Sequence, residues 1–192
     1  MSSDIWAVTF GSDADFYVTS ASGTASTPFT LANTQPEYHG VAYKVTVTPA
    51  ADETGKNFVI VGVGVDGNTL TETLAGAAVA FTSTNYFVSV TSITPDANTA
   101  GAVTIGYALS AGVYLPLTRI KGVYYVASGS AGSIVVTKAG SSQTILNLAT
   151  PASATVTQDI MIPANGLRTA DSPSDYSTVA VTNVTSVTLM CA

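Results

Sequence analysis

The segment FVIVGVGVDGNTLTETL, residues 58–74, decides the fold class of this 192-residue chain. Valines occupy every second position from Val59 to Val65, and alternate residues of a β-strand lie on one face of a sheet. Gly62 and Gly64 between them indicate a place where another backbone or a bulky side chain packs closely. Asp66-Gly67-Asn68 follows, and Asp-Gly supplies the positive φ values that a tight turn needs. The alternating residues after this turn, with a polar face toward solvent, complete a predicted antiparallel hairpin.

Short apolar runs recur along the whole chain, separated by Gly, Asn, Asp, Pro and Ser at spacings of roughly 8–12 residues, as in all-β proteins. The best helical candidate, residues 74–81, contains Gly76 and is weak. We therefore predict an all-β fold with very little helix, in which residues 86–94 and 102–109 pair with each other across residues 95–101. Strands are expected at residues 44–48, 59–65, 69–74, 86–94, 102–109, 113–121, 123–127, 133–138, 143–149, 155–162 and 178–189, the last broken near Asn183.

The domain organisation follows from the chain length, which suits two small sandwiches better than one large sheet. A second series of strands begins after Ala111-Gly112. We predict two consecutive small antiparallel β-sandwich modules, residues 36–111 and 112–192, preceded by an extended N-terminal segment, residues 1–35.

The N-terminal segment carries large apolar residues without a regular alternation. One interpretation is an arm that packs on a neighbouring subunit and buries aromatic side chains there. The other is a first strand with loops that close the base of the first sandwich. The candidate interface residues under the first interpretation are Ile5, Trp6, Phe10, Phe16 and Tyr17.

The composition favours assembly. Charged residues make up 9% of the chain, against roughly 25% in an average soluble domain. Thr, Ser, Gly and Ala take their place, and a surface rich in these residues gives up its water easily. We therefore expect a homo-oligomer or a complex with neighbouring subunits.

The charge pattern excludes several partners. Six basic and twelve acidic residues give a net charge of −6, and the basic residues are scattered singly. Nucleic-acid binding needs clustered Lys and Arg, so no nucleic-acid partner is expected. No apolar run approaches the about 18 residues of a membrane span, and residues 1–4 lack the pattern of a signal peptide. Cys191 is the single cysteine and forms no internal disulfide, which suggests synthesis in a reducing cytoplasm.

Residues for catalysis are scarce. The chain has one histidine, His39, and one cysteine, Cys191, close to the C-terminus, where chains commonly fray. One imidazole cannot supply a His-based metal site. We predict no catalytic residue, no metal and no cofactor, and therefore a protein that is not an enzyme.

The carboxylates give no stronger signal. Asp4, Asp13 and Asp15 have part of a calcium-loop spacing but lack its glycine and closing glutamate. Asp52 and Glu53 lie in a turn-rich segment, where solvated carboxylates are expected.

Four tyrosines fall near the expected module boundary: Tyr107, Tyr114, Tyr124 and Tyr125. Aromatic rings on a β surface can stack on sugar rings. They can equally fill the seam between two sandwiches, with each hydroxyl hydrogen-bonded. Both interpretations remain open from the sequence.

The segment from Pro36 to Tyr107 resembles a small β module of tailed-bacteriophage virion proteins. Its opening strand is KVTVT, residues 44–48, and its most specific part is STNYFVSVTSIT, residues 83–94, followed by TAGAVTIG, residues 99–106. The second half is similar to C-terminal β modules of phage structural proteins, through IPANGLR and STVAVTNVT. The resemblance implies a β-sandwich structural protein and carries over no catalytic or binding residue.

The resemblance further implies a place in the virion, after assembly in the host cytoplasm. The expected function is that of a capsid decoration protein that contacts the major capsid protein or other virion proteins and stabilises the head. A neck, tail or fibre-attachment component of the same particle is the alternative, because such modules occur in all these positions. A carbohydrate- or receptor-binding module that uses the tyrosines is a third interpretation.

Overall fold

The computed structural model describes residues 6–36, 41–109, 112–116, 118–139, 141–152, 157–162, 166–169, 171 and 176–192. These residues form 17 β-strands and no α-helix, which confirms the all-β fold class. They also contain no helix with the length and apolar character needed to cross a membrane. The chain divides into two compact units, which we call unit 1 (residues 1–12 and 112–192) and unit 2 (residues 13–111).

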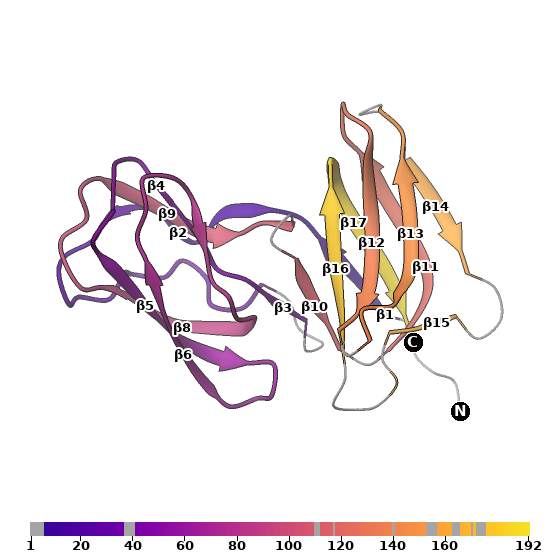
Figure 1. The fold of residues 1–192 in the computed structure, drawn as a ribbon, viewed down its shortest axis with the longest axis horizontal. Coiled ribbons are helices and arrows are strands. Elements are labelled where there is room, and N and C mark those ends of the chain that lie inside the picture. Colours follow the sequence, from indigo (N-terminus) through magenta and orange to yellow (C-terminus); the bar gives the residue numbers. More distant parts are fainter. Residues whose placement is uncertain are drawn as a thin grey trace. The chain divides into compact units, whose positions relative to one another are not determined.

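Unit 2 consists of two layers of antiparallel strands (Figure 1). Side chains from both layers form one buried hydrophobic cluster, including Tyr17 and Ile105 from one layer and Phe58, Ile60 and Ile93 from the other. Burial of each such side chain contributes about 1.5–3 kcal/mol. The strands of the first layer, in spatial order, are β2 (Asp13–Ser22), β9 (Ala102–Tyr107), β4 (Thr46–Pro49) and β7 (Phe81–Thr82). The strands of the second layer, in spatial order, are β3 (Ala42–Tyr43), β8 (Phe87–Pro95), β5 (Asn57–Gly64) and β6 (Thr69–Ala75).

The hairpin predicted for residues 58–74 is confirmed: β5 and β6 are antiparallel neighbours. Gly67 has a φ of 78°, and its N–H donates to the Gly64 carbonyl over 3.0 Å. The Asp66 carboxylate accepts hydrogen bonds from the Asn68 backbone N–H at 3.0 Å and from Asn68 Nδ2 at 2.9 Å. Turn chemistry that is local in sequence therefore fixes this end of the sheet.

The close packing predicted at Gly62 is also present. A Cβ atom on Gly62 would overlap the backbone oxygen of Ser89 and approach the Phe87 ring to 2.9 Å. The register between β5 and β8 shifts at this point, between Val61 and Gly62. The glycine therefore allows β8 to pass close to β5 at a β-bulge.

The expected pairing of residues 86–94 with 102–109 is wrong. β8 pairs with β3 and β5, whereas β9 pairs with β2 and β4, so the two strands lie in different layers. The intervening loop is held by both layers, because Asp96 N–H donates to the Asn57 carbonyl at 2.9 Å and Thr99 N–H donates to the Gly23 carbonyl at 3.0 Å. The chain thus changes layer here instead of forming a hairpin.

Unit 1 is also built from two layers of strands (Figure 1). Its interior contains Phe10, Val123, Tyr125, Val136 and Leu189, all fully buried. The strands of the first layer, in spatial order, are β1 (Trp6–Phe10), β17 (Val184–Cys191), β11 (Arg119–Ala127) and β14 (Thr157–Met161); β15 (Leu167–Arg168) also pairs with β11. The strands of the second layer, in spatial order, are β13 (Thr144–Thr150), β12 (Gly132–Lys138), β16 (Ser177–Thr182) and β10 (Val113–Leu115).

Two strand boundaries in unit 1 show the effect of single residues. Residues 113–121 do not form one strand, because β10 ends before Pro116, which lacks a backbone N–H. Residues 119–127 instead form the continuous strand β11. The predicted break at Asn183 is confirmed: this residue has a φ of 51° and separates β16 from β17.

The N-terminal segment, residues 1–35, is divided between the two units. β1 pairs with β17 in unit 1, from Trp6 opposite Cys191 to Phe10 opposite Val187. β2 begins at Asp13 and pairs with β9 in unit 2. The described part of this segment therefore supplies a strand to each unit, because its apolar side chains fill two different interiors.

Candidate functional site

Three of the five predicted interface residues have described side chains, and each of the three packs within its own unit. Ile5 and the side chain of Trp6 lie outside the described residues. Phe10 is fully buried in unit 1, and Tyr17 is fully buried in unit 2. Phe16 is partly buried and packs edge-on against Tyr17, with ring centroids 5.1 Å apart. The three described side chains therefore contribute to the interiors of their own units.

Groups suited to catalysis or metal binding are sparse in the described part of the chain. It contains no cluster of three or more His, Cys, Asp or Glu side chains that could hold a metal ion. His39 and Asp4 lie outside the described residues. Cys191 is buried within β17, and burial raises the pKa of its thiol to about 11. A thiol with this pKa is protonated near neutral pH and is a poor nucleophile.

The four tyrosines near the predicted boundary have different surroundings. Tyr107 contacts the rings of Phe16, Tyr17 and Tyr43 within unit 2. Within unit 1, Tyr114 packs on Tyr176 with ring centroids 4.6 Å apart, and Tyr125 is buried. Tyr124 is 40% exposed and is the exposed member of the four. Among the three tyrosines of unit 1, only the ring of Tyr124 is exposed enough for a sugar to stack on it.

The outer surface of β5, β6 and β8 is the most regular candidate for an interaction site. Phe58 and Ile60 belong to the core, so strand alternation places Val59, Val61 and Val63 on the opposite face. The register aligns each valine with one hydroxyl residue on β6 and one on β8. We call the resulting nine residues the Thr/Val face; its rows are Thr73–Val59–Thr94, Thr71–Val61–Ser92 and Thr69–Val63–Ser89.

The Thr/Val face contains no charged side chain. Its three β6 threonines are exposed, and its valines are half-buried. Covering a charged group removes strongly held water, whereas a threonine hydroxyl or a valine methyl loses much less hydration free energy. The face can therefore be covered by another protein surface without burying an unpaired charge.

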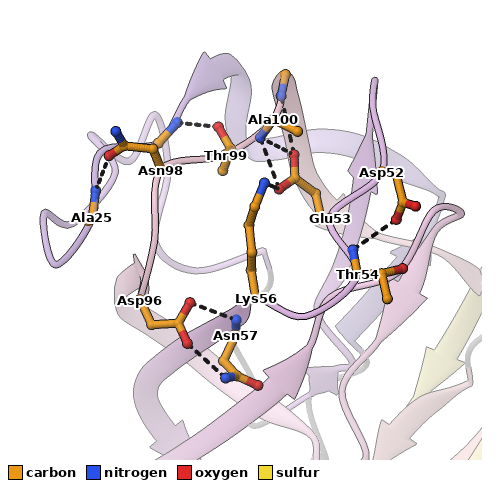
Figure 2. A network of polar contacts seen from close by, with 12 residues as sticks. Ala25, Asp52, Glu53, Thr54, Lys56, Asn57, Asp96, Asn98, Thr99 and Ala100 are labelled. Atoms are coloured by element: carbon orange, nitrogen blue, oxygen red, sulfur yellow. Dashed lines mark hydrogen bonds and ion pairs between the residues drawn. The ribbon is translucent and has the colours of Figure 1, made fainter.

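Two aspartates fix the ends of the strands beneath the Thr/Val face. At one end Asp96 binds Asn57, the first residue of β5, through the backbone N–H at 2.8 Å and Nδ2 at 2.7 Å (Figure 2). These hydrogen bonds lower the pKa of Asp96. At the other end Asp66 binds Asn68 in the hairpin turn, and those hydrogen bonds lower the pKa of Asp66. The register of the face is thus held at both ends.

A buried carboxylate anchors the loops beside Asp96. Glu53 is 0% exposed, and Figure 2 shows its side chain directed at Lys56 and at the backbone of Ala100. Its oxygens accept hydrogen bonds from Lys56 Nζ at 2.6 Å, from the Ala100 N–H at 2.8 and 3.1 Å, and from the Gly101 N–H at 3.3 Å. Burial raises the pKa of Glu53, but these hydrogen bonds outweigh it and leave the pKa below its ordinary value.

The expectation of a solvated Asp52 and Glu53 pair is therefore wrong for Glu53. The Asp52 carboxylate accepts a hydrogen bond from the Thr54 N–H at 2.8 Å within its own exposed turn. Glu53 instead joins two loops that are far apart in sequence, which no local pattern indicates. Its oxygens are occupied by donors, so this network holds structure and presents no free acid or base.

Comparison with known proteins found no matching family model, no matching curated protein and no matching solved structure.

Proposed function

We propose that the protein is a non-enzymatic structural protein of a tailed-bacteriophage virion, and specifically a capsid decoration protein built of two consecutive β-sandwich modules. The proposal places it in the virion, after assembly in the host cytoplasm, as a homo-oligomer or a partner of the major capsid protein. Two things support it: the resemblance of residues 36–107 to phage virion modules, and the Thr/Val face. The face is the single structural observation that carries the proposal.

The size of the Thr/Val face favours a protein that acts in many copies. Three strands spaced about 4.8 Å apart, with a rise of about 3.3 Å per residue, give the face an area on the order of 300 Å². A stable interface buries about 800 Å² on each partner. One such face binds weakly, but many symmetric copies on a shell add up to a durable attachment.

Rigidity supports the same proposal. The strands under the Thr/Val face are held at one end by the hydrogen bonds of Asp96 and at the other by those of Asp66. A preformed face loses little conformational entropy when a partner covers it. More of the free energy of the weak contacts therefore remains as binding free energy than it would with a flexible surface.

Introducing a charge into the Thr/Val face tests the proposal. Thr71 is exposed in the edge strand β6, and Thr19 is also an exposed threonine, in β2, the edge strand of the other layer. We expect Thr71→Lys to leave the protein folded but to reduce its incorporation into phage particles, because the partner surface would bury an unpaired ammonium. Thr19→Lys, the matched control, should be incorporated normally. Equal incorporation of both variants would contradict the role of the face.

The position in the particle separates the two virion alternatives. A decoration protein is present in many copies spread over the head, whereas a component of a neck or tail ring is present in few copies. Quantitative mass spectrometry of purified particles distinguishes these cases.

The third interpretation, a carbohydrate- or receptor-binding module, is favoured by the exposed ring of Tyr124. It predicts binding on a glycan array that Tyr124→Ala abolishes.

A further inference from the structure

The outer edge of β6 offers backbone groups for a further strand. Among the described strands β6 has one hydrogen-bonded neighbour, β5. The two strands pair without a register shift, from Thr69 opposite Val63 to Ala75 opposite Asn57. A strand in this position has a row of unpaired N–H and C=O groups along its other side. Such a row can bind an extended segment of another chain as an additional strand.

Two hydrogen bonds just beyond the ends of this pair show which residues of β6 face outward. The Gly64 N–H donates to the Asn68 carbonyl at 2.9 Å, and the Gly76 N–H donates to the Lys56 carbonyl at 2.8 Å. Bonded residues alternate along an antiparallel pair, so the even-numbered residues of β6 bond to β5. The odd-numbered residues direct their backbone groups away from β5, and all four are exposed: Thr69, Thr71, Thr73 and Ala75.

The length and regularity of β6 suit it to bind another strand. Edge strands are commonly protected by Pro, by Lys, by β-bulges or by being very short. β6 contains neither Pro nor Lys and is seven residues long. In the other layer of unit 2, the edge strand β2 has two register shifts in its pairing, and the edge strand β7 has two residues. Of these three strands, β6 has the longest regular edge.

Glu72 places a negative charge at the middle of this edge. Its carboxylate accepts hydrogen bonds from the Thr84 N–H at 2.6 Å, from the Asn85 N–H at 3.0 Å and from Asn85 Nδ2 at 3.0 Å. These donors are neutral, and Glu72 forms no ion pair within the described part of the chain. A basic side chain on a strand paired with β6 would lie beside this carboxylate and form an ion pair with it.

The charge distribution distinguishes between a second copy and a different partner. Unit 2 contains eight acidic and two basic residues and therefore has a net charge of −6. One of the two basic residues, Lys56, is already paired with Glu53 at 2.6 Å. Pairing of β6 with β6 of a second copy would bring two such units together. In the register centred on the strand it would also oppose Glu72 to Glu72, where like charges repel each other. A basic segment is attracted instead.

We propose that the outer edge of β6 binds an extended basic segment of another protein as an additional strand. The backbone of this segment bonds to Thr69, Thr71 and Thr73. Its Lys or Arg side chains, at alternate positions, lie on the side of Glu72, and the residues between them lie beside the threonines of the Thr/Val face. The added strand widens that face. Binding at this edge goes beyond the proposed function and does not require a place in a virion.

Titration of the full chain with a synthetic peptide at low ionic strength tests the proposal. The probe is acetyl-Thr-Lys-Val-Lys-Thr-Lys-Val-amide, and the control peptide has Glu in place of each Lys. Amide hydrogen exchange followed by NMR reports on each backbone N–H. Saturating basic peptide should slow exchange at Thr71 and Thr73 by about tenfold or more. The amides of Leu70 and Leu74, which bond to β5, should change little, and the Glu peptide should protect none of these amides further.

Two variants separate the charge from the backbone. Glu72→Gln keeps an oxygen for the donors of residues 84 and 85 and should weaken binding about threefold, the contribution of one exposed ion pair. Asp15→Asn removes a carboxylate from β2 in the other layer and is the matched control, which should bind as the wild type does. Thr71→Pro removes an outward N–H without removing a bond to β5 and should abolish binding. Circular dichroism shows whether each variant is folded.

The proposal would be overturned if the basic peptide does not protect Thr71 and Thr73, or if the Glu peptide protects them equally well. Protection of the same amides that rises with protein concentration in the absence of peptide would identify a second copy as the occupant and would overturn the proposed partner class. Reduced incorporation of Thr71→Lys into particles, together with no peptide binding by the wild type, would support the Thr/Val face and overturn the proposal for the edge.

Discussion

Asp96 holds Asn57 with both carboxylate oxygens, one on the backbone N–H at 2.8 Å and one on Nδ2 at 2.7 Å. Asn57 begins β5, and Asp96 directly follows β8. One exposed side chain therefore closes the end of two paired strands, β5 and β8, which are two of the three strands of the Thr/Val face. The lowered pKa of Asp96 reflects the same hydrogen bonds.

Replacing Asp96 with alanine should lower the thermal midpoint of unfolding. The variant loses both hydrogen bonds to Asn57, and the ends of β5 and β8 fray. Asp159→Ala, at an exposed position of β14, is the control and should leave the midpoint unchanged. The role of Asp96 as a clamp would be refuted by equal midpoints in the two variants.

Glu53 should make the protein sensitive to acid. Its pKa is lower in the folded state than its ordinary value of about 4.5, so the folded state favours the charged carboxylate. The resulting stabilisation is present above the ordinary pKa and is lost as the pH falls through the folded-state pKa. Urea denaturation at pH 7 and at pH 3 measures this loss.

Glu53→Gln should cost about 1–3 kcal/mol at pH 7, because a neutral amide replaces a buried carboxylate that accepts charged and backbone hydrogen bonds. The variant should also lose less stability on acidification than the wild type does. An unchanged pH profile in Glu53→Gln would show that other carboxylates account for the acid response.

Gly62→Ala should destabilise unit 2 by about 1–3 kcal/mol, because the added methyl group overlaps the Ser89 backbone oxygen. Gly11→Ala is the matched control, since a Cβ atom at Gly11 has no neighbour within 4 Å. Chemical denaturation of both variants measures the difference. A Gly62→Ala variant as stable as the control would mean that β8 can move away from β5 without cost.

Tyr17→Phe should stabilise the protein by roughly 1 kcal/mol. The Tyr17 hydroxyl is buried and has no hydrogen-bond partner among the described residues. Folding therefore costs the hydration free energy of this hydroxyl without a compensating hydrogen bond, and removing the hydroxyl removes that cost. Burial, together with the nearby Tyr107, raises the pKa of Tyr17 above its ordinary value of about 10.

The Tyr17 hydroxyl should also make the stability of the protein depend on pH in the alkaline range. Since the pKa is raised in the folded state, wild-type stability should fall as the pH rises above about 10, where the unfolded chain ionises. Tyr17→Phe should lose less stability in this range than the wild type does, because the ionisable hydroxyl is absent. A destabilised Tyr17→Phe would reveal a hydrogen bond made by the hydroxyl.

Phe10→Ala should cost about 3–5 kcal/mol, because it leaves a cavity in the fully packed interior of unit 1. Urea denaturation measures the cost, and deletion of residues 1–35 should be more severe because it removes β1 and β2 together. A truncated protein that remains folded but no longer joins particles would favour the arm interpretation instead.

The features that could be predicted from the sequence are those whose determining chemistry is local. Asp66, Gly67 and Asn68 contain all that the hairpin turn needs, and the φ of 51° at Asn183 separates β16 from β17 where an Asn interrupts a strand pattern. Alternation within single strands likewise located most of them. These features depend on neighbours within a few residues, so they are visible in a sequence alone.

Contacts between distant residues were not predictable in this way. The donors of Ala100 and Gly101 lie 47 and 48 positions from Glu53, and nothing around Glu53 indicates them. The register that opposes Arg119 to Arg168 is equally non-local. Phe58 and Ile60 alternate as regularly as the valines beside them, so the face that enters the core is decided by packing against the other layer.

Unit 2 is inserted in the sequence between the two segments of unit 1, and this order has a consequence for folding during synthesis. β1 is made before unit 2, but its partner β17 is available only after residues 184–191 have been made. Unit 2 lies entirely between them, and its two ends meet where Asp13 opposes Tyr107. Unit 2 can therefore fold as a closed insertion before β17 has been made, whereas unit 1 is complete only when β17 pairs with β1.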